Sequence, residues 1–286
     1  MKFVSYRRAN GAVEAGVLTG DKVVNLTAAG FPTMIDVIQA ADKVRERVAS
    51  WVDIPLASVK LVAPVPRPPK LICVGLNYRD HAIESKMEIP TVPTIFNKFP
   101  NVVIGPDDAI VLPKNSKRPD YEAEMAFVIG KGGRHIPAEK WREHVFGYTI
   151  MNDVSARDFQ MATSQWLMGK TFDTFAPMGP VLVSADEIPD PHALDISLTI
   201  NGETLQNSNT RELIFKIPDL VAFLSSVVTL EPGDIVSTGT PSGVGFARKP
   251  PRYLQPGDDV VVRVQGIGEL RNRVVAEEIA AASPAS

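Results

Sequence analysis

The chain has 286 residues, of which 44% are hydrophobic and 22% are charged, as in ordinary globular proteins. A formal net charge of −3 without any basic cluster excludes an electrostatic footprint for nucleic acid. No apolar run approaches the roughly 20 residues that span a bilayer, and the first residues lack an apolar signal-peptide core. We therefore expect a cytoplasmic protein with no nucleic-acid and no membrane partner.

Metal-binding residue types are few. The single cysteine, Cys73, excludes internal disulfides and cysteine-rich zinc sites, and its apolar neighbours favour a buried thiol. The four histidines, His81, His135, His144 and His192, are scattered along the chain, which disfavours a three-histidine zinc site. Any metal site is expected to use oxygen ligands.

The first 62 residues predict a small αβ domain. Three short strand patterns, "KFVSYRR", "VEAGVLT" and "KVVNL", are joined by Asn-Gly and Gly-Asp turns. Apolar residues at helical spacing then predict one helix over residues 33–52. Residues 63–70 hold four prolines and predict an extended linker before a catalytic domain over residues 71–286.

The remainder is mostly strand. Apolar or alternating runs predict strands in "LICVGL", "EAEMAFVIGKGG" and "HVFGYTIMND", a hairpin turning at Asn201-Gly202, and a helix with Pro218 in its first turn. The Ala/Ser/Pro stretch after Glu278 is expected to fray. Long strand runs with few helices predict an α+β, mainly β fold, a mixed β-sandwich or roll and not a doubly wound sheet.

Two glutamates interrupt the strand pattern of residues 120–130. Glu122 and Glu124 share one face of that strand, about 6 to 7 Å apart, although both faces continue as apolar. Two buried carboxylates at this separation repel each other unless they share a proton, pair with cations or bind a metal ion. A strand end that projects into solvent also accounts for the pattern.

A second acidic strand end favours the metal hypothesis. The apolar run of residues 145–151 ends in Asn152-Asp153, where a loop begins. Three carboxylates without a nearby Cys or His cluster suit a hard divalent cation, Mg²⁺ first and Mn²⁺ or Ca²⁺ as alternatives. Glu122, Glu124 and Asp153 would leave about three octahedral positions for a chelating substrate.

Three further groups could serve such a site. His81 and Glu84 lie three residues apart on a helix that Asn77 would cap, so the carboxylate could orient a general-base imidazole; taken alone, the motif favours a solvated helix face. Lys170 lies among apolar residues, either snorkelling or buried beside anions. The loop 237–245, "STGTPSGVG", could present hydroxyl and N–H groups to an anion.

In chain order, these segments resemble the fumarylacetoacetate hydrolase family. The resemblance covers about residues 68 to 275 and is carried by "CVGLNYRDHAIE", "DYEAEMAFVIG", "NDVSARDFQ", "GKTFDTFAPMGP", "NGETLQ" and "GDIVSTGTPSGVGF". It implies a mixed β-sandwich roll, a homodimer, and a lid near residues 84–100. The site residues that it implies are the metal ligands Glu122, Glu124 and Asp153, the dyad His81 and Glu84, the lysine Lys170, and the substrate contacts Arg157, Gln160 and Thr240.

The chain is most similar to short family members associated with acylpyruvate hydrolysis, oxaloacetate decarboxylation or isomerisation of hydroxymuconate-type diacids. The expected activity is metal-dependent hydrolysis of a C–C bond in 2,4-dioxo acids of the acylpyruvate or fumarylpyruvate type, through a metal-stabilised enolate. Oxaloacetate decarboxylation and 2-hydroxyhepta-2,4-diene-1,7-dioate-type isomerisation are alternatives at the same site, because both pass through the same enolate. A non-catalytic dicarboxylate-binding module, or acidic residues without any ligand, are the alternatives from other classes.

Overall fold

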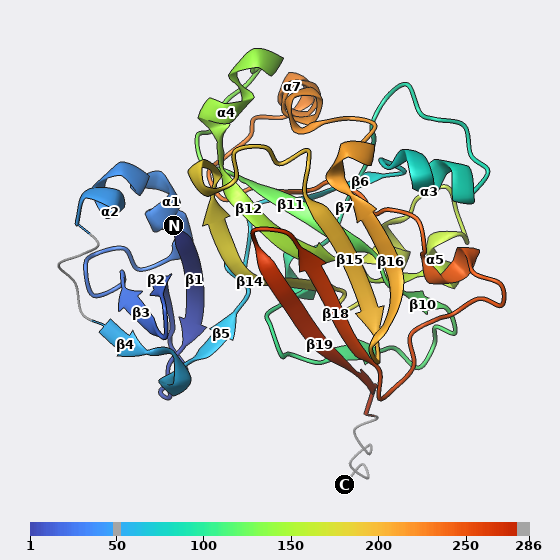
Figure 1. Ribbon diagram of the computed structural model, residues 1–286, viewed down its shortest axis with the longest axis horizontal. Coiled ribbons are helices and arrows are strands. Elements are labelled where there is room, and N and C mark those ends of the chain that lie inside the picture. Colours follow the sequence, from blue (N-terminus) through green and yellow to red (C-terminus); the bar gives the residue numbers. More distant parts are fainter. Residues whose placement is uncertain (48–52, 279–286) are drawn as a thin grey trace, which may run out of the picture.

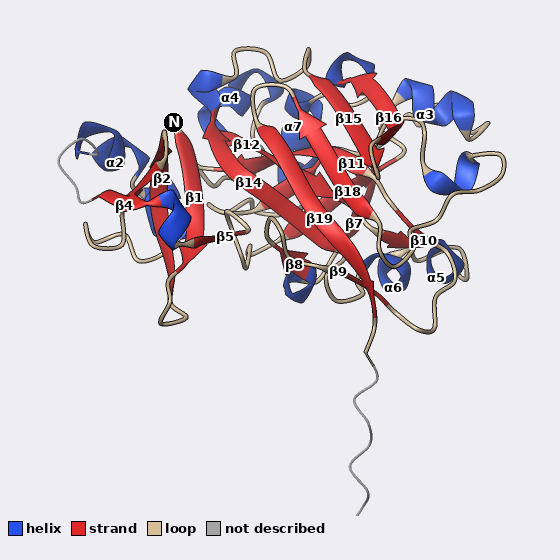
Figure 2. Ribbon diagram, turned by 60° about the horizontal axis from the view of Figure 1, so that its bottom comes forward, coloured by secondary structure: helices blue, strands red, loops and turns tan. Residues whose placement is uncertain are grey.

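A computed structural model describes residues 1–47 and 53–278 of the chain (Figure 1). The end of the predicted helix over residues 33–52 and the stretch after Glu278 lie outside the described residues. Two β-sheets form most of the molecule, and short helices lie around them (Figure 2). The α+β, mainly β prediction is confirmed.

The larger sheet has 12 strands in the order β4-β3-β2-β1-β14-β12-β11-β17-β6-β7, with β5 on β1 and β8 on β14. Its strands are β1 (Lys2–Arg7), β2 (Val13–Thr19), β3 (Lys22–Asn25), β4 (Asp53–Pro55), β5 (Lys60–Val62), β6 (Leu71–Gly75), β7 (Thr94–Asn97), β8 (Val103–Ile104), β11 (Ala123–Ile129), β12 (Val145–Asn152), β14 (Ala176–Ser184) and β17 (Ile235–Ser237). Most neighbours are antiparallel, while β17 and β6 are parallel, so the sheet is mixed.

The second sheet has five strands and packs against the first. Its order is β16-β15-β18-β19-β9, with β9 (Ile110–Leu112), β15 (Asp195–Ile200), β16 (Glu203–Asn209), β18 (Asp259–Val264) and β19 (Gly268–Ala276). Strands β11, β12 and β14 contact β15, β18 and β19 across the interface. Phe127, Ile150, Leu198 and Val262 are buried in the core between the layers. A two-residue pair, β10 (Pro119–Asp120) and β13 (Ser155–Ala156), lies beside the sandwich.

The helices are short. They are α1 (Met34–Gln39), α2 (Ala41–Arg47), α3 (Arg79–Glu84), α4 (Trp141–His144), α5 (Arg157–Gln160), α6 (Leu167–Lys170) and α7 (Ile217–Val227). Helix α7 carries Pro218 in its first turn, as predicted. The single helix predicted from residue 33 is wrong, because Ala40, at φ −114° and ψ 27°, leaves the helical region between α1 and α2. Among the described residues, no helix combines the length and apolarity needed to cross a membrane.

The N-terminal residues continue the larger sheet. Strand β1 pairs with β14 through Lys2–Val183 and Phe3–Leu182, so β1 to β5 extend the sheet of the catalytic region (Figure 1). Residues 63–70 form neither helix nor strand, and Val65 among them is buried. The division into domains at these residues stays a prediction.

Candidate active site

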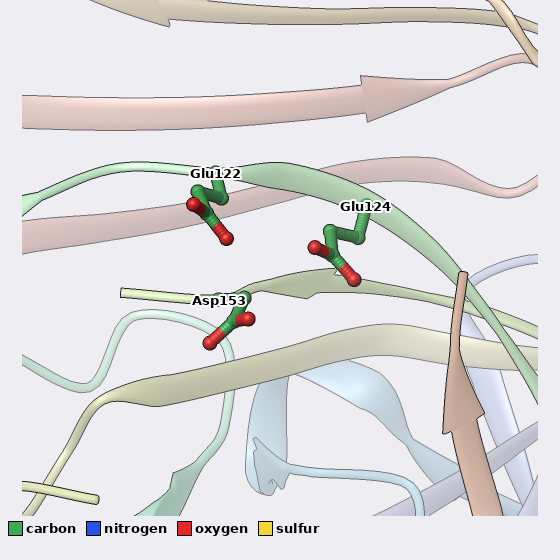
Figure 3. Close-up of side chains that lie close together, drawn as sticks. All are labelled: Glu122, Glu124 and Asp153. Carbon is green, nitrogen blue, oxygen red and sulfur yellow. The ribbon is translucent and has the colours of Figure 1, made fainter. Parts of the chain in front are cut away.

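The three predicted metal ligands converge. One carboxylate oxygen from each of Glu122, Glu124 and Asp153 lies within 4.8 Å of the others, and all three residues are buried (Figure 3). The antiparallel register of β11 and β12 explains this proximity, because Ala123 pairs with Asn152 and the Asp153 N–H donates to the Glu122 carbonyl at 2.9 Å. Glu122 was expected inside the strand but lies in the link just before β11.

Cations surround two of the three carboxylates. Lys170 Nζ lies 2.7 Å from both Glu122 Oε2 and Asp153 Oδ2, and Arg157 Nη2 lies 2.7 Å from Glu122 Oε1. Burial opposes the charge on Lys170, but the carboxylates, Asp153 first, outweigh it and raise the lysine's pKa. Burial likewise opposes the charge on Glu122, but Lys170 and Arg157 lower the glutamate's pKa. Of the two alternatives for Lys170, burial beside anions is the correct one.

Glu124 differs from its neighbours because its hydrogen-bond donors are neutral. It accepts from the Ser237 hydroxyl and from the Gly239 N–H at 3.0 Å. Burial raises the pKa of Glu124 well above its usual range, and the nearby charges of Asp153 and Glu122 raise it further. A divalent cation would relieve that repulsion, and oxygen ligands around one ion lie no more than about 4 to 5 Å apart. The donor set therefore fits Mg²⁺, Mn²⁺ or Ca²⁺.

The predicted dyad is formed at the end of α3. His81 Nδ1 lies 3.4 Å from Glu84 Oε2, the Gly243 N–H donates to both Glu84 oxygens at 3.0 Å, and His81 is buried. Gly243 has φ +98°, and a Cβ there would overlap the Leu205 carbonyl oxygen, so only glycine fits this position. The loop 237–245 thus presents backbone N–H groups to Glu124 and Glu84.

Asn77 does not cap α3, contrary to the prediction. Tyr78 occupies the N-cap position without a side-chain hydrogen bond. The buried Asn77 side chain instead accepts from the Phe215 N–H at 2.8 Å and donates to the carbonyls of Phe215 and Thr238 at 3.0 and 2.8 Å. These longer-range partners explain why the local cap is lost.

A pocket of about 150 Å³ joins these groups. Its polar wall consists of His81, Ser85, Glu122, Glu124, Arg157, Gln160, Lys170 and Thr240. Its remaining wall is mostly apolar and includes Val74, Leu76, Met87, Phe96, Met161, Trp166 and Phe246. Glu84 and Asp153 lie behind this lining, in contact with His81 and Lys170. The structure therefore gathers all nine predicted site residues in one place, while their roles stay predictions.

The predicted substrate contacts are themselves hydrogen-bonded to protein groups. Arg157 donates through Nε to Asp120 at 2.8 Å and through Nη1 to Gln160 at 2.8 Å. Thr240 accepts from Gln206 Nε2 at 2.9 Å. These bonds fix the orientation of the polar wall in advance of any ligand.

Sequence reasoning missed several supporting residues. Asp120 is fully buried and accepts from Arg157 and from the N–H groups of Gly245 and Phe246. Lys98 is buried and donates to Asp153. Lys98 follows "TIFN" and precedes Phe99 in the stretch expected near a lid; a lysine with apolar residues close by in the sequence is the same signal that singled out Lys170. Residues 94–97 of that stretch form β7, and the lid stays a prediction.

Residues 70–275 match the family model described as "Fumarylacetoacetate (FAA) hydrolase C-terminal". The chain belongs to the fumarylacetoacetate hydrolase family. The match begins at the strand β6 and covers every predicted site residue, so the fold, the motifs and the family assignment agree.

Relatives within the fumarylacetoacetate hydrolase family carry several activities in their names. A Rattus norvegicus protein named as a mitochondrial oxaloacetate tautomerase is 53% identical over 223 residues, which cover 78% of this chain and 71% of that protein. A fumarylacetoacetate hydrolase from Exiguobacterium antarcticum has a TM-score of 0.87 at 35% identity, covering 97% of this chain and 100% of that one. A maleylpyruvate hydrolase from Sphingobium sp. SYK-6, in complex with manganese(II) and pyruvate, has a TM-score of 0.83 at 32% identity, with coverages of 97% and 100%.

Proposed function

We propose that the protein is a divalent-metal-dependent enzyme that interconverts the keto and enol forms of a small 2-oxo acid, with oxaloacetate as its substrate. The observation that carries this proposal is the arrangement of one small pocket, where three buried carboxylates, a lysine and a histidine dyad meet. The tautomerase named among the relatives, at 53% identity, supports oxaloacetate over longer diacids.

Glu122, Glu124 and Asp153 would hold the ion, with Mg²⁺ as the first choice and Mn²⁺ or Ca²⁺ as alternatives. When bound, such an ion supplies Lewis acidity that polarises a carbonyl group. The manganese(II) and pyruvate in the maleylpyruvate hydrolase support this pairing of a divalent ion with a 2-oxo acid.

Side chains of the pocket carry out proton transfer, stabilisation of the enolate charge and binding of the substrate carboxylate. His81, whose Nδ1 faces Glu84, is the general base that takes a proton from C3 of the keto acid, and it returns that proton to the 2-oxygen to give the enol. Lys170 is the cation on the pocket wall that stabilises the negative charge of the enolate in between. Arg157 and Gln160 bind and orient the substrate carboxylate. The reaction consumes no water, in keeping with a pocket about half of whose lining residues are apolar.

Hydrolysis of 2,4-dioxo acids is the second candidate. The dyad favours it, because an imidazole held by a carboxylate can also take a proton from water that attacks the 4-carbonyl group. The maleylpyruvate hydrolase among the structural neighbours supports it too. Loss of carbon dioxide from oxaloacetate would pass through the same enolate.

A kinetic panel separates these activities. Metal-stripped protein is given Mg²⁺, Mn²⁺ or Ca²⁺ and assayed with oxaloacetate for tautomerisation by enol absorbance and for carbon dioxide release, and with acylpyruvates for cleavage. We expect metal-dependent tautomerisation to be the fastest reaction. Equal activity after chelation would contradict the proposal, and tight metal-dependent ligand binding without turnover would indicate a binding module.

The His81→Ala variant tests whether His81 is the general base. We expect it to lose about 10²- to 10⁴-fold in kcat for tautomerisation, the range typical of general-base removal. His135→Ala is the matched control, because His135 is exposed and lies outside the pocket, and it should retain wild-type rates. A His81→Ala variant with unchanged kcat would remove His81 from the mechanism.

A further inference from the structure

Lys98 is a fully buried cation directly behind the carboxylate cluster. It follows the last residue of β7, and its side chain has no exposed surface. Its Nζ donates to Asp153 Oδ1, to the Val154 carbonyl at 3.0 Å and to the Phe175 carbonyl at 2.6 Å. An ammonium group has three N–H donors, so each of them has a protein acceptor. Lys98 also lies outside the lining of the active-site pocket, which makes it a positioning residue and not a catalytic one.

The two oxygens of Asp153 are thereby given different surroundings. Oδ1 accepts from Lys98, and Oδ2 lies 2.7 Å from Lys170 Nζ, which also contacts Glu122 Oε2. The backbone on either side is fixed as well, because the Asp153 N–H donates to the Glu122 carbonyl at 2.9 Å and the Asp153 carbonyl accepts from Ser155 Oγ at 2.9 Å. Rotation of the carboxylate would break its bonds to both lysines. Because Lys170 lines the pocket and Lys98 does not, Oδ2 is the Asp153 oxygen on the pocket side, and Oδ1 is held on the far side by Lys98.

We propose that Lys98 makes Asp153 a one-oxygen ligand and so sets the metal selectivity of the site. Ca²⁺ accepts six to eight oxygens and readily takes both oxygens of one carboxylate, whereas Mg²⁺ requires close to six in an octahedron. A carboxylate whose second oxygen is already bonded to a buried ammonium group suits Mg²⁺ or Mn²⁺ and withholds a ligand from Ca²⁺. This inference rests on the proposed function, since it takes the same carboxylates as the metal ligands.

The selectivity ratio isolates this effect from the charge of Lys98. Removing a positive charge changes the attraction for every divalent cation in the same direction and by a similar factor. The ratio of Mg²⁺ to Ca²⁺ affinity cancels that factor and reports on coordination. It also requires no catalytic turnover.

The test measures binding of Mg²⁺, Mn²⁺ and Ca²⁺ by calorimetry to the wild type, Lys98→Met and Lys98→Arg. We expect Lys98→Met to lower the ratio of Mg²⁺ to Ca²⁺ affinity, by a factor no larger than the roughly 10- to 100-fold change in metal affinity that follows loss of a metal ligand's hydrogen-bond partner. Lys98→Arg, which keeps a donor toward Asp153, should retain most of the wild-type ratio. The matched control is Lys70→Met, which removes a lysine from its pair with buried Asp234 just before the strands β6 and β17 and should leave the ratio unchanged.

A crystal structure of the wild type with Ca²⁺ tests the inference without any variant. Coordination of Ca²⁺ through Asp153 Oδ2 alone supports it, and coordination through both oxygens overturns it, as does an unchanged ratio in folded Lys98→Met. These failures differ from failure of the proposed function, in which the wild type would bind no divalent cation or would bind one without turning over a 2-oxo acid.

Discussion

Gly75 shows how one missing methyl group can shape the pocket. It is the last residue of β6, and a Cβ at this position would overlap the six-membered ring of Trp166. Trp166 lines the apolar wall and packs edge-on against Phe96 at a centroid distance of 5.6 Å. Phe96 in turn lies 4.8 Å below Lys170 Nζ. Two aromatic rings therefore connect Gly75 to Lys170 through direct contacts.

We predict that Gly75→Ala displaces Trp166 and lowers kcat/KM for oxaloacetate by at least about 10-fold, because small misplacements of positioning groups are costly. Tryptophan fluorescence should change in the same variant. The overlap should also lower the stability of Gly75→Ala, whereas adding Gly75→Ala to Trp166→Ala, which lacks the ring, should cost little further stability. Wild-type kinetics in Gly75→Ala would show that the ring moves freely.

At the scale of elements, helix α7 begins at a histidine-dependent contact. The Ile217 N–H donates to His192 Nε2 at 3.2 Å, and the imidazole packs at 5.8 Å from the Trp141 ring. Burial lowers the pKa of His192, although Asp190 acts in the opposite direction. The sequence offered no reason to give this histidine a role, because its partner lies 25 residues further along the chain.

A pH dependence of stability follows from that lowered pKa. Just below the ordinary histidine pKa of about 6.5, His192 binds a proton in the unfolded chain but not in the folded chain. The contribution of His192 to the free energy of unfolding is therefore fully present above this pH and falls as the pH drops below it. Protonation also removes the acceptor of the Ile217 N–H, a loss of about 1 kcal/mol. Urea unfolding between pH 5 and 8 should show a shallower pH slope in His192→Gln, whose amide oxygen accepts without titrating. Parallel slopes would contradict this assignment.

Local patterns predicted the strands and the acidic pair well, because alternation and charge are visible in a few consecutive residues. The runs that became β6, β11, β12 and α7 are examples. The proximity of Asp153 to Glu122 could be predicted only by assuming that the two neighbouring strands pair, as β11 and β12 do. A local pattern could have singled out Lys98 as a buried lysine, but not its partner Asp153, 55 residues away. Likewise no local pattern identifies Phe215, 138 residues away, as the partner of Asn77.

At the scale of the whole molecule, the proposed metal site would couple metal binding to folding. Three carboxylates come together only in the folded chain, so an ion that binds them stabilises the folded state.

The homodimer remains a prediction. The cytoplasmic location also remains a prediction, and the rat relative is named as mitochondrial.

We predict that Mg²⁺ at about 100 times its dissociation constant raises the free energy of unfolding by about 2.7 kcal/mol. Urea titrations with Mg²⁺ or with a chelator measure this difference. Glu124→Gln keeps the size of the side chain and an oxygen for the Ser237 and Gly239 donors, so it should fold yet lose the increase. An equal increase in this variant would place the ion elsewhere.

The joining of β1 to β14 has a consequence for how such proteins can be shortened. Strand β14 has β12 on one side and β1 on the other, and the N-terminal amine at the start of β1 also bonds Ser184 at 2.6 Å. A truncated protein that starts at residue 70, where the family match begins, would expose part of the β14 edge. An exposed strand edge can pair with other chains and lead to aggregation. The first 62 residues thus cover part of the β14 edge, and we expect a protein of this fold without them to cover that edge in another way.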